Sequence, residues 1–160
     1  MYESSLNSRD RTLEDAINTT VFPNYIKNRF LEKLDFLTVC AWKTPRSKSR
    51  CESNADDYIR DISSLVLTTS SEQLRIEIWT LLRGVSWPTA SVFLHFAFPD
   101  RYPILDFRAI WSMGGEVPKQ YTFSFWNHYC DCCRKLAAEH NVSMRTLDQS
   151  LWLYSKLHQT

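Results

Sequence analysis

Residues 82–108, LRGVSWPTASVFLHFAFPDRYPILDFR, decide how this chain is interpreted. The segment contains Gly84, one of only three glycines among 160 residues, followed by Pro88 and an apolar run to Phe98. Glycine permits the left-handed backbone at which a helix ends, and proline fits the first turn of the next helix. The pattern therefore predicts two helices joined by a tight turn, with Asp106 at the start of a further helix.

Helical periodicity extends over most of the chain, and we predict an all-α fold with about seven or eight helices. Leu74, Ile76 and Ile78 alternate as in a strand, but Ser70 and Gln73 form a capping-box pattern, so we favour a helix there. Helices are expected at 12–22, from 24 onward, from about 55, at 70–83, 88–98, 106–113 and 124–140, and from 143 or 146, with a loop at 43–54. The side chains expected on their buried faces are Ile26, Phe30, Leu34 and Leu37; Tyr58, Ile62 and Leu65; Ile78, Leu81 and Leu82; Trp126, Tyr129, Cys133 and Leu136; and Leu147, Leu151 and Tyr154.

Composition predicts one soluble domain. The length suits a single core, so we expect a flexible N-terminus at 1–10 and one all-α domain at 11–160, with the helix pair at about 72–98. The net charge of +1 provides no overall attraction for nucleic acid, so any basic surface must be local. An odd number of cysteines (five), a polar start without a signal-peptide pattern and the lack of a long apolar run favour a cytoplasmic protein that does not enter a membrane.

The turn in residues 82–108 resembles the hairpin of the helix-hairpin-helix DNA glycosylase superfamily, which includes endonuclease III and the MutY-type adenine glycosylases. That hairpin has the pattern Leu-x-Gly-Val-Gly-x-x-Thr-Ala, which is matched here by Leu82, Gly84, Val85, Thr89 and Ala90. Asp106 lies 22 positions after Gly84, at the interval of the family's catalytic aspartate, and YPILD resembles the segment that leads to it.

The resemblance implies a protein that binds double-stranded DNA and acts on an extruded base. Asp106 would be the catalytic carboxylate, stabilising positive charge on the sugar and activating water. Backbone amides at the hairpin would hold a DNA phosphate. The residues implied for DNA binding are Gly84, Val85, Ser86, Trp87, Thr89 and Ala90.

Departures from the family pattern narrow the expected activity. Ser86 replaces the second hairpin glycine, and Pro88 stands at the position of the Schiff-base lysine, so a monofunctional glycosylase is implied and a lyase is not. The chain has no iron–sulfur cysteine loop, no counterpart of the wedge loop and a short region before the hairpin, which implies a reduced domain without cofactors. Two alternatives stay open: a non-catalytic module that binds DNA or a protein through its hairpin, and Asp106 acting only as a helix cap.

Other residues also have two interpretations. Lys43, Arg46, Lys48 and Arg50 either contact DNA phosphates or are solvated charges of a loop, and Trp42 beside them is suited to stack on a base. His128, Cys130, Cys132 and Cys133 are spaced too tightly for a usual zinc site, so we favour buried cysteines without a metal. His95 is expected in the core or in a pocket wall.

Overall fold

A computed structural model describes residues 2–5 and 7–159 of the chain, and all regular structure in these residues is helical. The predicted all-α fold is therefore confirmed. In these two ranges eleven segments are α-helical, more than we predicted, because several expected helices are divided by short breaks. Ile76 and Ile78 lie in consecutive helical turns, so helix was the correct choice over strand for that segment.

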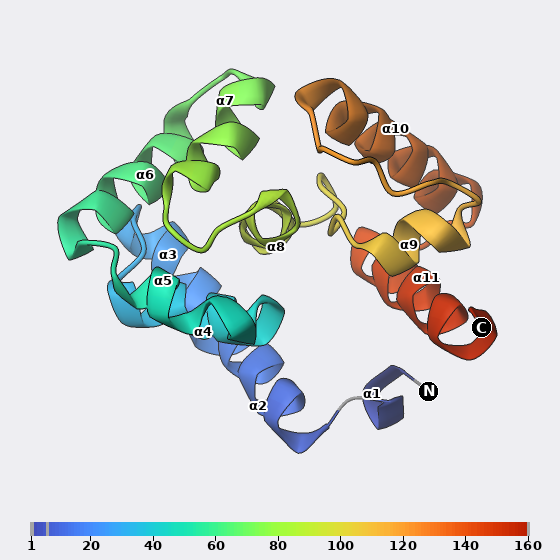
Figure 1. Cartoon of the computed structure of the whole chain (residues 1–160), viewed down its shortest axis with the longest axis horizontal. Coiled ribbons are helices and arrows are strands. Elements are labelled where there is room, and N and C mark those ends of the chain that lie inside the picture. Colours follow the sequence, from blue (N-terminus) through green and yellow to red (C-terminus); the bar gives the residue numbers. More distant parts are fainter. Residues whose placement is uncertain (1, 6, 160) are drawn as a thin grey trace.

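Helix α8 (Trp87–Ala97) lies at the centre of the molecule, with one group of helices on each side (Figure 1). The first group contains α2 (Ser8–Ala16), a π-helical turn (Ile17–Val21), α3 (Phe22–Asn28), α4 (Lys33–Lys43), a 3₁₀ turn (Pro45–Ser47), α5 (Lys48–Glu52), α6 (Asp56–Thr68), α7 (Glu72–Glu77) and a second 3₁₀ turn (Ile78–Leu81). The second group contains α9 (Phe107–Ser112), α10 (Phe123–Glu139) and α11 (Met144–His158), against which the short α1 (Tyr2–Ser5) packs. The N-terminal helix thus lies with the C-terminal group.

The core is built around α8, and neighbouring helices cover it on several sides. Phe93 of α8 stacks on Trp79 with ring centroids 4.2 Å apart, and on its other neighbour Phe36 at 5.7 Å. Tyr102, just after α8, stacks on Trp126 of α10 at 5.5 Å. Large flat side chains therefore join both groups of helices to the central helix, in agreement with the aromatic-rich composition.

The N-terminal helices differ from our predictions in their boundaries. We expected one helix at 12–22 and another from 24, but Pro23 lies in the first turn of α3, which continues the π-helical turn without a gap. The chain breaks instead at Arg29, with a φ of 68°, and resumes at α4. This break changes the phase of the apolar pattern, so Ile26 and Leu34, predicted to be buried, are exposed.

Further predictions on local structure were wrong. Residues 43–54 are not a loop but contain the 3₁₀ turn at 45–47 and α5. Helix α6 is rotated from the predicted face: Ile59, Ile62 and Val66 are buried, whereas Tyr58 and Leu65 are exposed. Ser71, not Ser70, caps α7 by accepting from the amide of Leu74. Leu81 and Tyr154 are likewise exposed where burial was predicted.

The predictions for residues 82–108 agree with the structure better than those for the N-terminal helices. Gly84 has a φ of +83°, Pro88 lies in the first turn of α8, and Asp106 is the N-cap of α9. The start of α11 after Ser143 and the burial of Trp126, Tyr129 and Cys133 on α10 are also as predicted. Of the segment 1–10, for which we expected flexibility, residues 2–5 and 8–10 are helical, and residues 1 and 6 lie outside the described residues.

Candidate functional site

The hairpin at 82–87 is fixed against α5 and the turn that follows α5. The side-chain amide of Asn54 donates to the carbonyl of Arg83 at 2.9 Å, and its oxygen accepts from the Arg83 amide at 2.8 Å. A Cβ on Gly84 would lie 2.5 Å from Sγ of Cys51 and 3.1 Å from its backbone nitrogen. The turn therefore needs glycine at position 84 for two reasons: its φ is left-handed, and α5 approaches it closely.

The matched hairpin side chains are mainly structural. Val85, Thr89 and Ala90 are buried, so their side chains pack inside the protein. Within the described part of the chain, the amides of Gly84, Ser86 and Trp87 have no protein acceptor, and Ser86 makes no capping bond. The hairpin thus offers backbone N–H groups at the N-terminus of α8, where the helix dipole favours an anion.

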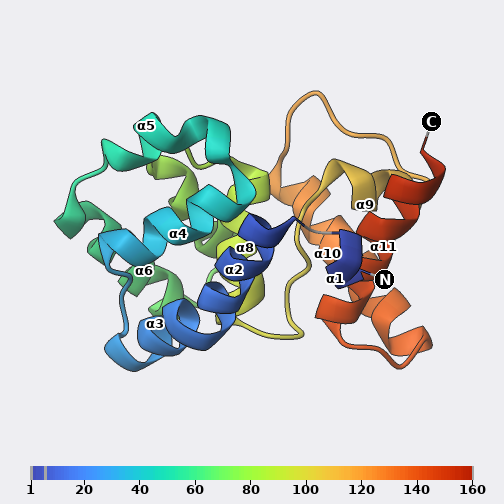
Figure 2. The ribbon, with the colours of Figure 1, turned by 90° about the horizontal axis from the view of Figure 1, so that it is seen from below.

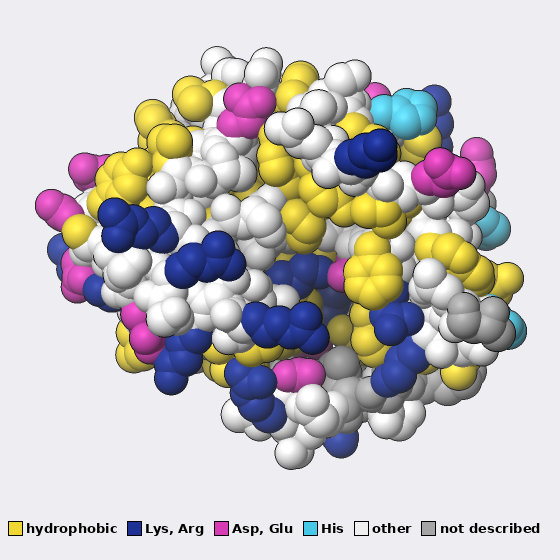
Figure 3. Space-filling model, in the orientation of Figure 1, with side chains coloured by type: hydrophobic (Ala, Val, Ile, Leu, Met, Phe, Trp, Pro, Cys, Tyr) yellow, Lys and Arg dark blue, Asp and Glu magenta, His cyan; other side chains and the backbone are white. Residues whose placement is uncertain are grey.

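Basic side chains lie next to the hairpin. Arg46, Lys48 and Arg50 are exposed on the 3₁₀ turn and α5, and Arg83 is exposed in the hairpin itself. Lys48 forms a loose pair with Glu52 at 3.8 Å, and Arg50 donates to the Ser47 hydroxyl at 3.1 Å. On the face shown in Figure 3, Lys and Arg side chains gather over the lower half and around a central hollow.

Lys43 belongs to a different environment from these residues. Its ammonium lies 2.6 Å from Oδ2 of Asp106, and both side chains are only 16% exposed. The other oxygen of Asp106, Oδ1, accepts from the Arg108 amide at 2.9 Å as a helix cap. The pair joins the end of α4 to the start of α9, and so links the two groups of helices. Asp106 therefore has two roles: it caps α9, as its sequence context predicted, and it forms an ion pair with Lys43.

Asp106 and Lys43 line a cavity of about 190 Å³. Trp42 and Trp152 contribute flat walls, and Asp148 provides a second carboxylate. The lining residues are Tyr2, Asp10, Trp42, Lys43, Ile104, Asp106, Asp148 and Trp152. The cavity therefore combines aromatic walls with an acidic group held in place by a lysine, and Trp42, which we predicted to stack on a base, is one of the walls.

Asp148 was not identified from the sequence. It is buried, and burial raises the pKa of its carboxyl group to about 6, although the charges of Arg145 and Lys43 oppose this shift. Arg145 donates to Asp148 at 2.5 Å and also to Glu14 of α2. The sequence contained a signal for this burial, because Asp148 falls on the same helical face as Leu151 and Ser155.

The cysteine cluster lies on α10. Cys130 and Cys133 are buried, and burial raises the pKa of Cys133 to about 12. Cys132 is partly exposed, with its sulfur 3.5 Å from Nε2 of His128. In residues 2–5 and 7–159, no group of three or more His, Cys, Asp or Glu side chains is arranged to hold a metal ion. His95 is buried in the wall of a second cavity, as expected.

Comparisons with protein-family models, with curated proteins and with solved structures found no match for this chain. Among the described residues, no helix combines the length and the apolar character needed to cross a membrane. The site must therefore be interpreted from its own geometry and from the hairpin pattern.

Proposed function

We propose that the protein binds duplex DNA and hydrolyses the N-glycosidic bond of an extruded base, as a reduced, monofunctional relative of the helix-hairpin-helix glycosylases. The observation that carries the proposal is the Asp106 carboxylate in a cavity walled by Trp42 and Trp152. Its volume is below the roughly 300–1,000 Å³ of pockets for drug-sized ligands, which suits one flat heterocycle. Stacking between aromatic side chains is a common way of holding an extruded base.

The proposed reaction adds water to C1′ of the sugar while the bond from C1′ to the base nitrogen breaks. The base leaves with the electron pair of that bond and takes up a proton. Asp106 stabilises the cationic sugar and accepts the proton that the water loses. Lys43 holds Oδ2 of Asp106 and fixes the direction of its carboxylate. Because an ion-paired ammonium has no free electron pair, Lys43 does not attack the sugar, and no covalent imine is expected.

DNA contact is assigned to two features of the hairpin and its surroundings. The free amides of Gly84, Ser86 and Trp87 suit a phosphate oxygen, and Arg46, Lys48, Arg50 and Arg83 supply positive charge beside them. α5, which carries part of this charge, lies on the same side of the molecule as the segment between α9 and α10 (Figure 2). Binding would be local and sensitive to salt because the chain as a whole is nearly neutral.

Base excision is tested with Asp106→Asn, which keeps the cap and the shape but removes the charge. Wild type and variant are incubated with duplexes carrying uracil, 8-oxoguanine opposite adenine, alkylated purines or mismatches, and abasic sites are then cleaved with alkali. We expect excision by wild type of at least one base and a loss of about 10²-fold or more in the variant.

The matched control is Asp61→Asn, which changes an exposed acid of α6 and should excise as wild type does. Borohydride should trap no protein–DNA adduct. Absence of excision from all substrates by wild type would overturn the enzymatic proposal, and equal activity of Asp106→Asn would remove Asp106 from the chemistry.

One observation favours a second function, a hairpin module that binds DNA without catalysis. The Lys43–Asp106 pair at 2.6 Å neutralises the carboxylate and joins α4 to α9, which is sufficient reason for an aspartate at this position. This alternative predicts DNA binding without excision, and the same duplex assays therefore distinguish the two functions.

DNA binding is tested by removing charge near the hairpin. We expect Lys48→Gln with Arg50→Gln to weaken duplex binding at low salt and to reduce the slope of log K against log salt by about 1 for each lost phosphate contact. Lys27→Gln with Lys135→Gln removes the same charge from exposed positions of α3 and α10 and should bind as wild type does. Equal losses in both double variants would show that only net charge matters, and salt-independent binding would contradict the interface.

A further inference from the structure

A larger cavity, of about 630 Å³, lies between α3, the C-terminal half of α8 and the turn between α10 and α11. It shares no lining residue with the Asp106 cavity. Figure 2 places α3 and the α10–α11 turn on the side opposite to α5, so this second cavity is remote from the hairpin. Its volume is within the usual range for small-molecule sites.

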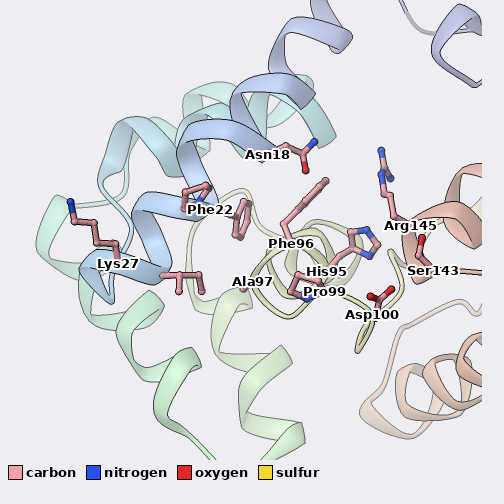
Figure 4. A pocket seen from close by; sticks show the side chains of 12 residues that line it. Asn18, Phe22, Lys27, His95, Phe96, Ala97, Pro99, Asp100, Ser143 and Arg145 are labelled. Carbon is pink, nitrogen blue, oxygen red and sulfur yellow. The ribbon is translucent and has the colours of Figure 1, made fainter.

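The cavity has an apolar part and a polar part, which Figure 4 shows. Phe22 and Phe96 form the apolar part, with ring centroids 5.4 Å apart, and Pro99 lies beside them. His95, Ser143 and Arg145 lie toward the other end. Such a site suits a molecule with a flat apolar body and one polar group.

His95 provides an unused hydrogen-bond acceptor in this cavity. Its Nδ1 lies 2.8 Å from the carbonyl oxygen of Tyr102, which can only accept, so Nδ1 carries the proton and Nε2 carries a lone pair. His95 is 4% exposed, and burial together with the charge of Arg145 lowers the pKa of its imidazole to about 4. In the parts of the chain that the structure describes, Nε2 has no hydrogen-bond partner, and since His95 lines the cavity this atom is open to a ligand.

Arg145 does not make the polar end a site for anions. Its guanidinium donates to Asp148 and to Glu14, so two carboxylates balance its charge. Asp100, also in the lining, adds negative charge nearby. A neutral donor therefore fits this end better than a carboxylate or a phosphate does.

We propose that this cavity binds a small, neutral heteroaromatic compound whose ring N–H donates to Nε2 of His95 while its ring packs against Phe22 and Phe96. The proposal is independent of the DNA function, because it uses a different cavity and none of the residues assigned to excision.

The test compares indole with 1-methylindole, which has the same ring but no N–H. Binding of each to the full chain is measured by calorimetry at pH 7, and the imidazole nitrogen shifts of His95 are followed by NMR. We expect indole to bind at least ten-fold more tightly, because 1-methylindole leaves the buried acceptor without a partner, and indole should shift Nε2 of His95.

His95→Asn is the informative variant, since its side-chain amide can still donate to the Tyr102 carbonyl, whereas the shorter side chain has no acceptor at the position of Nε2. It should bind both compounds equally and weakly, whereas His128→Asn, at an exposed position of α10, should retain the preference for indole. The proposal is overturned if neither compound binds wild type, if both bind equally well, or if indole leaves the Nε2 signal unchanged. The comparison on wild type stands even where His95→Asn does not fold.

Discussion

Two buried titratable residues, Asp148 and His95, respond to pH in opposite directions. Burial raises the pKa of Asp148 from 3.8 to about 6, so its ionisation disfavours the folded state as pH rises through that range. Burial lowers the pKa of His95 from 6.5 to about 4, so its protonation disfavours the folded state as pH falls through that range. Each effect is of the order of 3 kcal/mol, and between pH 4 and 6 they largely offset each other.

Asp148→Asn is predicted to remove this compensation. The asparagine oxygen can still accept from Arg145, but the group no longer titrates. The free energy of unfolding of the variant should therefore fall more steeply than that of wild type as pH is lowered from 6.5 to 4.5, because Asp148 no longer offsets the His95 effect. Urea unfolding at intervals of half a pH unit measures this. Asp61→Asn should follow wild type, and a parallel profile for Asp148→Asn would show that Asp148 does not titrate in this range.

At the scale of elements, the approach of the hairpin to α5 depends on Gly84. Gly84 and Gly114 both have left-handed backbone, with φ of +83° and +75°, but a Cβ on Gly114 would meet nothing within 4 Å. Gly114→Ala therefore measures backbone strain alone, about 1 kcal/mol. Gly84→Ala adds a clash with Cys51 and should cost about 2 kcal/mol more.

The steric part of this prediction is tested by combining Gly84→Ala with Cys51→Ala, which removes Sγ. The double variant should regain part of the lost stability relative to the sum of the two single changes, although the backbone of Cys51 at 3.1 Å prevents full recovery. Thermal unfolding compares the variants. Equal costs for Gly84→Ala and Gly114→Ala would mean that α5 shifts away from the hairpin without penalty.

At the scale of the whole molecule, Arg145 joins the two groups of helices. From α11 it donates to Glu14 of α2, and its guanidinium lies over the rings of Trp42 in α4 and Phe96 in α8, at 5.8 and 5.6 Å. The Lys43–Asp106 pair makes a second link between the groups. Arg145 and the Lys43–Asp106 pair therefore hold the two groups of helices together, and these residues also line the two cavities.

Arg145→Met is predicted to destabilise the fold by about 3–5 kcal/mol, because it leaves the carboxylates of Asp148 and Glu14 without their partner in a buried environment. Arg60→Met is the matched control: Arg60 pairs with Glu32 at 2.7 Å, but on the exposed surface, so its loss should destabilise the fold far less than the loss of Arg145. Denaturant unfolding measures both. Similar losses of stability in the two variants would contradict the assignment of Arg145 as the residue that joins the two groups of helices.

Local sequence signals were sufficient for the helical class and for the segment around α8. Gly84, Pro88 and Asp106 were placed correctly because a left-handed turn, a proline in a first turn and an acidic N-cap depend on backbone chemistry within a few residues. Ser143 was predictable for the same reason. The DNA-binding and catalytic roles that the hairpin pattern implies remain predictions.

Tertiary structure decided which helical faces are buried and which distant side chains meet. The break at Arg29 and the rotation of α6 reversed several expected burials, because a shift of one or two residues turns a helix face by 100° or more. The meeting of Lys43 with Asp106, 63 positions apart, and of Arg145 with Glu14, 131 apart, follows from how the two groups of helices pack around α8. Periodicity specifies only that a helix has an apolar side; the partner that covers that side, and the charges that become buried beside it, are set by the packing of the whole chain.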